Sequence, residues 1–221
     1  MTVKWLMHFQ PNQGTTLTSQ VMAEACAVAE SFPGVSRDGR WRSSMTFYRA
    51  VPRDQSLPAP SDLPRDLIGI SLHDLPNEYL FVMRSQRLIL RAHSSVQTVM
   101  DKLQSYKGRF FINFEGLQYK WGDFKLRIGK CLYNPNEALR GIVMEVEYLP
   151  LSSIDKSQRV MEEFYEIWRE AVASKLLAGQ FINTEVNFVE YGLGDSYTPQ
   201  HTAVLYGMCV VQVIASSNKN Q

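Results

Sequence analysis

The sequence has no surplus of charge of either sign. Its 221 residues carry 23 Lys and Arg against 22 Asp and Glu, which gives a net charge of +1. Proteins that neutralise several phosphates need a basic surplus or a dense basic patch. The small basic groups at 37–42 and 84–91 are of a size that one polar strand face produces routinely. We therefore expect no direct contact with nucleic acid.

Cysteine is scarce, and long apolar runs are missing. The chain has three cysteines, Cys26, Cys131 and Cys209. Their wide spacing fits neither a metal site nor a redox motif and favours a reducing intracellular setting. The first ten residues lack the apolar core and cleavage site of a secretory signal. The longest apolar run, 203–215, is shorter than the roughly 20 residues that cross a bilayer. These absences predict a soluble protein that has no membrane partner.

The motifs of common enzyme chemistry are also missing. The four histidines are scattered, no Gly-rich phosphate loop is present, and neither a nucleophile elbow nor a catalytic cysteine signature occurs. We therefore expect no catalytic residue, no metal, no cofactor and no small-molecule substrate.

Hydrophobic periodicity predicts an α+β fold. Hydrophobic residues make up 45% of the chain, enough for one well-buried core. Period-2 and aromatic-rich runs predict strands at 3–9, 39–51, 68–72, 79–83, 87–91, 109–115, 123–133 and 138–149. Helical spacing predicts helices at 15–31, 95–106 and 155–178, with Asp155 as the cap of the last.

Short turns between sequential strands favour a curled antiparallel sheet that closes into a barrel of about eight strands, with helices packed outside. We expect one domain over 1–221, with a Pro-rich surface insert near 52–64. Thr198-Pro199 predicts the start of a C-terminal helix near 199–215, although its valines leave a strand open for 203–215.

The runs 123–133 and 138–149 form the clearest predicted hairpin. A register that pairs Ile128 with Met144 sets apolar residues against apolar residues on one face. The same register pairs Arg127 with Glu145 and Lys125 with Glu147 on the other face. Both faces agree, which is what a specified register requires.

The carboxylates of Glu145 and Glu147 leave one enzymatic alternative. Alternating glutamates on a barrel strand hold metal in tunnel-type triphosphate hydrolases, and Lys125 and Arg127 could then contact phosphate. A hard cation needs about six oxygen ligands, and this strand supplies only one Glu-x-Glu pair. Cross-strand ion pairs on a solvated face explain the same four residues, and we favour that interpretation.

Two segments of the hairpin resemble a known family. They are Tyr119-Lys120-Trp121-Gly122-Asp123-Phe124 continuing to Gly129, and Ala138-Leu139-Arg140-Gly141-Ile142 continuing to Tyr148. These residues resemble subunit 20 of the Mediator complex, the TRF-proximal protein family, in a plant version. The segment from Leu75-Pro76-Asn77-Glu78-Tyr79 to Leu103 also fits, and the likeness covers about 3–176. The regions 52–64 and 179–199 depart from the family pattern, so no role is carried over there.

The resemblance implies a non-enzymatic, structural subunit in the Mediator head module, a coactivator of transcription in the nucleus. It implies direct pairing with Mediator subunit 18, subunit 8 in the same submodule, and indirect contact with RNA polymerase II. It also implies a barrel related to the tunnel triphosphatases without their catalytic residues.

The partner surface follows no family motif, so its prediction comes from composition alone. The final run has more apolar residues than one face touching its own sheet requires. We expect part of it to contact a partner through Val204, Leu205, Met208 and Val211.

Overall fold

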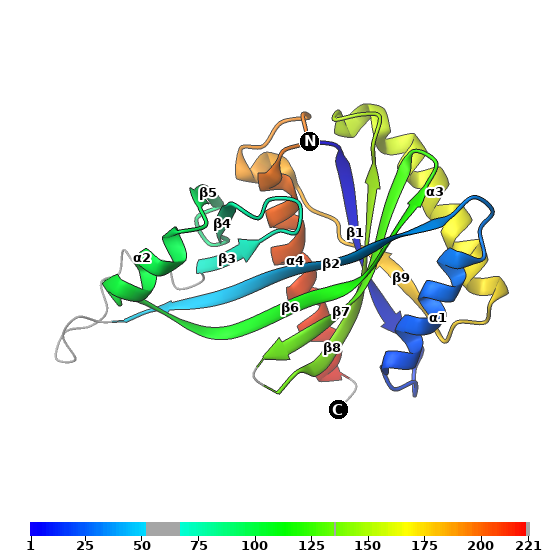
Figure 1. Ribbon diagram of the computed structural model, residues 1–221, viewed down its shortest axis with the longest axis horizontal. Coiled ribbons are helices and arrows are strands. Elements are labelled where there is room, and N and C mark those ends of the chain that lie inside the picture. Colours follow the sequence, from blue (N-terminus) through cyan, green and yellow to red (C-terminus); the bar gives the residue numbers. More distant parts are fainter. Residues whose placement is uncertain (52–66, 135, 220–221) are drawn as a thin grey trace.

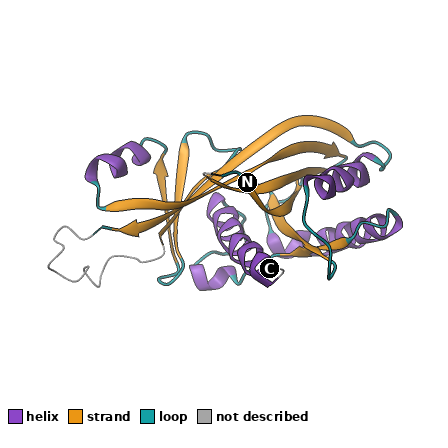
Figure 2. Ribbon diagram, turned by 90° about the horizontal axis from the view of Figure 1, so that it is seen from below, coloured by secondary structure: helices purple, strands orange, loops and turns teal. Residues whose placement is uncertain are grey.

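The computed structural model describes residues 1–51, 67–134 and 136–219, so the predicted Pro-rich insert near 52–64 lies outside the described residues. Nine strands and four α-helices make up the described part of the chain (Figure 1, Figure 2). The strands are β1 (Val3–Pro11), β2 (Ser36–Ala50), β3 (Leu67–Ser71), β4 (Glu78–Met83), β5 (Leu88–His93), β6 (Tyr106–Trp121), β7 (Phe124–Asn134), β8 (Ala138–Tyr148) and β9 (Gly179–Asn183). The helices are α1 (Ser19–Glu30), α2 (Val96–Leu103), α3 (Ile154–Ser174) and α4 (Pro199–Lys219), with a 3-10 turn at Phe188–Tyr191.

All nine strands belong to one antiparallel sheet, in the order β5-β4-β3-β2-β6-β7-β8-β1-β9. The α+β class is confirmed, but the predicted closure into a barrel is wrong, because β5 and β9 are the two free ends of the sheet in the described chain. Helix α4 gives the physical reason. It contacts β1 and β8 towards one end of the sheet and β4 and β5 at the other, so it fills the space that a closed barrel would enclose.

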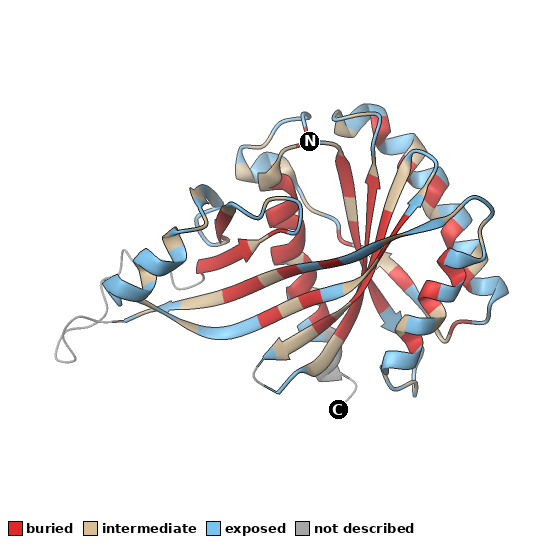
Figure 3. Cartoon of the chain, viewed as in Figure 1, coloured by how far each residue is buried: buried red, intermediate tan, exposed pale blue. Residues whose placement is uncertain are grey.

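The predicted hairpin register is confirmed. Ile128 pairs with Met144, Leu126 with Val146, and Arg127 with Glu145. The apolar face of this hairpin packs against α1 and α3 in one buried cluster, and Figure 3 shows the buried stripe along both strands. Apolar residues at helical spacing on α3, among them Trp168, complete that cluster.

The other face of the sheet packs against α4 in a second buried cluster. Tyr206, Cys209, Val210 and Val213 of α4 belong to it, together with apolar side chains of the central strands. Because α4 is covered from several sides, it is apolar around most of its circumference, which a surface helix is not. The chain between 203 and 215 is therefore helix, and its valines did not make it a strand.

Several predicted boundaries shift. Ser153 caps α3 by accepting a hydrogen bond from the Lys156 N–H at 3.2 Å, while Asp155 lies in the first turn of the helix. Helix α3 ends at Ser174, earlier than the predicted 178. Strand β6 runs well beyond the predicted 109–115 because its whole length pairs with β2 and β7. None of the described helices has the length and apolar character that would let it cross a membrane.

Candidate functional site

The polar face of the β7–β8 hairpin is buried, so the expectation that it is solvated is wrong. Arg127 retains 3% of its accessible surface and Glu145 retains 2%. Lys4 and Glu147 are buried as well, and Lys125 is half-buried. This face lies under α4 and the loop after β3, which the sequence does not place there. The cross-strand pairs therefore form part of an ionic network inside the molecule.

Arg127 lies at the centre of the network. Its Nη1 donates to Glu145 Oε1 at 2.7 Å and to Asp74 Oδ2 at 2.8 Å. Its Nη2 donates to the other oxygen of Asp74, which makes that pair bidentate. Its Nε donates to Gln118 Oε1 at 2.7 Å on the neighbouring strand β6. All three guanidinium nitrogens therefore have acceptors, as a buried arginine requires.

Lys4 supplies the second buried cation from β1, where it lies opposite Glu147. Its Nζ is 2.6 Å from Asp74 Oδ2 and 2.9 Å from Glu145 Oε1. Glu147 Oε2 is 3.7 Å from Lys4 Nζ and 3.3 Å from Lys125 Nζ. Three carboxylates thus face three cationic side chains, and the charges of the network balance.

Two hydroxyl groups complete the network. The Tyr206 hydroxyl of α4 donates to Glu145 Oε2 at 2.9 Å, so both oxygens of this buried carboxylate have donors. The Thr2 hydroxyl donates to Glu147 Oε1. The network thereby connects the N-terminal strand, the loop after β3, the central hairpin and α4.

The pKa values follow from these contacts. Burial lowers the pKa of Lys4, but the charges of Glu145 and Glu147 outweigh burial and leave it above its ordinary range. Burial raises the pKa of Glu145, but Lys4 and Arg127 outweigh burial and leave it below its ordinary range. Burial raises the pKa of Asp74 as well, but the hydrogen bond from Arg127 and the charge of Lys4 outweigh burial and leave it below its ordinary range. Lys4, Asp74 and Glu145 are therefore charged near pH 7.

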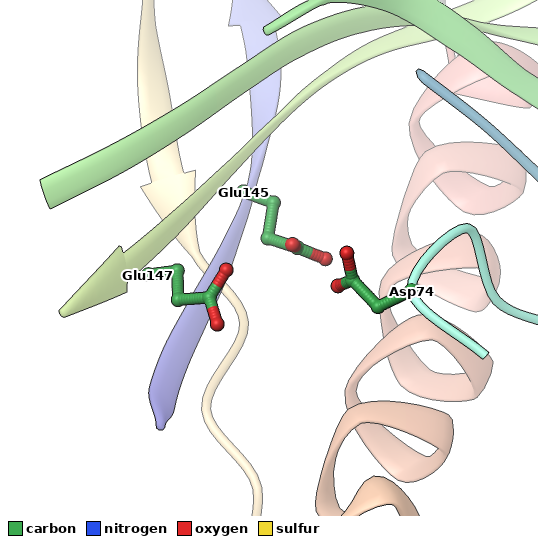
Figure 4. A group of neighbouring side chains, drawn as sticks. All are labelled: Asp74, Glu145 and Glu147. Atoms are coloured by element: carbon green, nitrogen blue, oxygen red, sulfur yellow. The ribbon is translucent and has the colours of Figure 1, made fainter. Parts of the chain in front are cut away.

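The carboxylates of Asp74, Glu145 and Glu147 raise the question of a metal, because an oxygen of each lies within 4.8 Å of the others (Figure 4). Glu145 and Glu147 project from β8, and Asp74 faces Glu145 from the loop after β3. The ammonium of Lys4 already contacts all three carboxylates. A divalent cation would have to displace this buried charge, so the donor set does not fit a metal. The alternative of a metal-dependent triphosphate hydrolase required Glu145 and Glu147 to hold a metal ion, and the structure does not support that role.

Sequence reasoning missed Lys4 and Asp74. A single lysine inside the apolar strand β1 is a signal, because a buried ammonium needs a carboxylate partner. It does not say which carboxylate. Asp74 lies in a loop and reaches the network only through the tertiary fold, so the sequence carries no signal for it.

The four residues predicted to contact a partner divide into two pairs. Val204 and Leu205 are buried in the chain's own core beneath the sheet. Met208 is half-buried, and Val211 retains 36% of its accessible surface. Only Met208 and Val211 therefore reach the surface of the chain, and partner contact there stays a prediction.

Val211 borders an apolar groove at the end of the molecule where α4 finishes. The groove is lined by Phe47, Arg84, Phe110, Ile112, Tyr133, Arg140, Val211, Ile214 and Ala215. Its residues come from six separate parts of the chain, so no local pattern in the sequence could have indicated it.

The comparisons with known proteins agree with the resemblance. The family model for "TATA-binding related factor (TRF) of subunit 20 of Mediator complex" matches residues 1–209. "Mediator of RNA polymerase II transcription subunit 20b" from Arabidopsis thaliana is 48% identical and aligns with 98% of this chain and 97% of its own. A chain in the structure of the Schizosaccharomyces pombe Mediator head module is similar at a TM-score of 0.43 and 13% identity, covering 81% of this chain and 98% of that one.

An RNA triphosphatase from S. pombe matches at a TM-score of 0.35 and 9% identity, covering 79% of this chain and 84% of that one. Both structural likenesses are remote, whereas the family match and the plant relative extend over nearly the whole chain. The chain therefore belongs to the family of subunit 20 of the Mediator complex, as a structural, non-enzymatic subunit of that complex.

Proposed function

We propose that this subunit belongs to the Mediator head module and works in the nucleus by protein–protein contact, connecting regulators with RNA polymerase II. Its direct partner in this proposal is Mediator subunit 18, with subunit 8 in the same submodule. The family match along residues 1–209 carries the proposal. The buried, charge-balanced network supports it, because it leaves no open catalytic centre on the polar face of the hairpin.

The end of α4 is the contact surface that we assign to a partner. Met208 and Val211 reach the surface from a helix whose residues 201–207, 209 and 210 are buried. Apolar side chains that remain exposed beside a well-packed core are typical of the centre of a protein interface. Contact through this end of α4 would leave the ionic network untouched.

Affinity purification from plant nuclear extract tests the proposal. The tagged full-length chain is expected to recover other Mediator subunits, subunits 18 and 8 among them, as measured by mass spectrometry. Recovery of the chain without any other Mediator subunit would overturn the proposed function. Co-expression with subunit 18 tests the direct contact, since the two chains should co-elute in size-exclusion chromatography. Separate elution would overturn that pairing alone.

A further inference from the structure

We propose that the groove at the end of α4 binds an apolar protein segment that carries Asp or Glu beside its apolar residues. This inference rests on the proposed function, since it names the chemistry of one contact inside the assembly. The segment belongs to a different chain, and its apolar side chains fill the groove while a carboxylate meets Arg84 at the rim.

The walls of the groove are apolar and exposed. Phe110 of β6 retains 51% of its accessible surface, and Ile214 of α4 retains 41%. The Phe110 ring lies 6.5 Å from the Phe47 ring and 6.0 Å from the Tyr133 ring, measured between centroids. Three aromatic rings from three neighbouring strands thus line the groove together with residues near the end of α4. Clustered aromatic side chains of this kind supply much of the binding energy in protein interfaces.

The rim of the groove is basic. Arg84, directly after β4, and Arg140 of β8 are its only charged residues, and no Asp or Glu of the described chain lines it. The Arg140 guanidinium lies 5.5 Å from the centroid of the Tyr133 ring, a position that holds it beside the aromatic wall.

Arg84 is half-buried and differs from the basic groups of the ionic network. Its Nε is buried without an acceptor, and none of the residues that the structure describes forms an ion pair with its guanidinium. An arginine in this position is stabilised by a carboxylate, which accepts hydrogen bonds from two of its nitrogens at once. The groove therefore favours an acidic occupant over a neutral or basic one.

Photo-cross-linking in the assembled complex tests the inference. Phe110 is replaced by p-benzoylphenylalanine in the full-length chain, and Leu103 of α2, which is 63% exposed but lies outside the groove, serves as the control position. We expect position 110 to cross-link to another Mediator subunit, within a segment that has Asp or Glu beside apolar residues. Position 103 should give no such product.

A charge reversal tests the acidic character separately. Arg84→Glu should lower the yield of the cross-link from position 110 by about tenfold, because two negative groups would then face each other. Arg109→Glu reverses an exposed arginine that does not line the groove and should leave the yield unchanged. Equal yields in the two variants would overturn the acidic occupant.

Other results would overturn the groove as a docking site. They are a cross-link within the same chain, a cross-link to a second copy, or no cross-link from a chain that still recovers Mediator subunits. The last result would leave the proposed function intact. Failure to recover any Mediator subunit with the unmodified chain would instead overturn the proposed function itself.

Discussion

At the scale of single residues, Arg127 is the side chain on which the buried network depends most. It forms ion pairs with Glu145 and Asp74. The side chains of Arg127 and Glu145 are each 3% exposed, so solvent has little access to this pair. Arg127→Ala leaves a buried carboxylate with less compensation and should lower the free energy of unfolding by about 3–5 kcal/mol. Urea denaturation followed by circular dichroism measures this loss.

The matched control is Arg159→Ala, which removes an arginine of an exposed i,i+4 pair on α3. Its effect should be close to zero, because exposed pairs of this kind contribute little. If Arg127→Ala costs no more than Arg159→Ala, the network does not stabilise the fold in the way its geometry indicates.

The acidic members of the network predict a pH dependence. The pKa values of Glu145 and Asp74 lie below their ordinary values of 4.5 and 3.8 in the folded chain. The unfolded chain therefore binds more protons as the pH falls below these ordinary values. Their stabilising contribution is present above that range and is lost as the pH falls through the lowered folded-state values.

Thermal unfolding between pH 3 and pH 7 measures this effect as a melting temperature that falls towards acid. Asp74→Asn should make the fall shallower, because one of the two groups no longer titrates. It should also lower the melting temperature at neutral pH, since Arg127 and Lys4 lose a charged partner. If the melting temperature of the variant falls as steeply towards acid as that of the unmodified chain, Asp74 is not a source of the pH dependence.

At the scale of elements, local pattern predicted what depends on neighbours in sequence. The pairing of Arg127 with Glu145 followed from two adjacent alternating runs, and the structure has that register. The burial of the same pair depends on where α4 and the loop with Asp74 come to lie. Those contacts join residues far apart in the sequence, so periodicity carries no information about them.

Helix α4 also explains why barrel closure was predicted wrongly. Sequential strands with short turns favour a curled sheet, and the sheet does curl. Whether its ends then meet depends on what fills the interior. Here Tyr206, Val210 and Val213 of α4 occupy that space, and this use of an apolar helix is not visible in a sequence window.

The contact between α4 and β8 can be tested at Gly141. A Cβ added there would lie 2.6 Å from Val213 Cγ1, so Gly141→Ala forces the helix and the strand apart. The free energy of unfolding should fall by about 1–3 kcal/mol, as overpacking usually costs. Chemical denaturation checks the value. Gly194→Ala is the control, because nothing lies within 4 Å of the added Cβ there.

A double substitution separates crowding from any other cause. Val213→Ala removes the methyl groups that the new Cβ would meet, so Gly141→Ala should cost less in its presence. The double variant should be more stable than the sum of the two single losses predicts, by about 0.5–3 kcal/mol. Strictly additive losses would show that α4 does not pack on β8 as the structure has it.

At the scale of the whole molecule, α4 both fills the core and borders the groove, and two adjacent residues serve these roles separately. Val210 is fully buried in the core, and Val211 is 36% exposed beside the groove. Val210→Glu places an unpaired carboxylate in the core and should prevent stable folding. Val211→Glu places the same side chain at the surface and should leave the melting temperature nearly unchanged.

The two variants therefore distinguish a structural from a partner-binding role for the end of the helix. Val211→Glu should still give a folded chain by circular dichroism while recovering less of the other Mediator subunits in affinity purification. Loss is expected because an interface excludes an unpaired charge from its apolar centre. Full recovery by a folded Val211→Glu chain would place the partner surface elsewhere, and a large fall in its melting temperature would mean that this end of α4 serves the core alone.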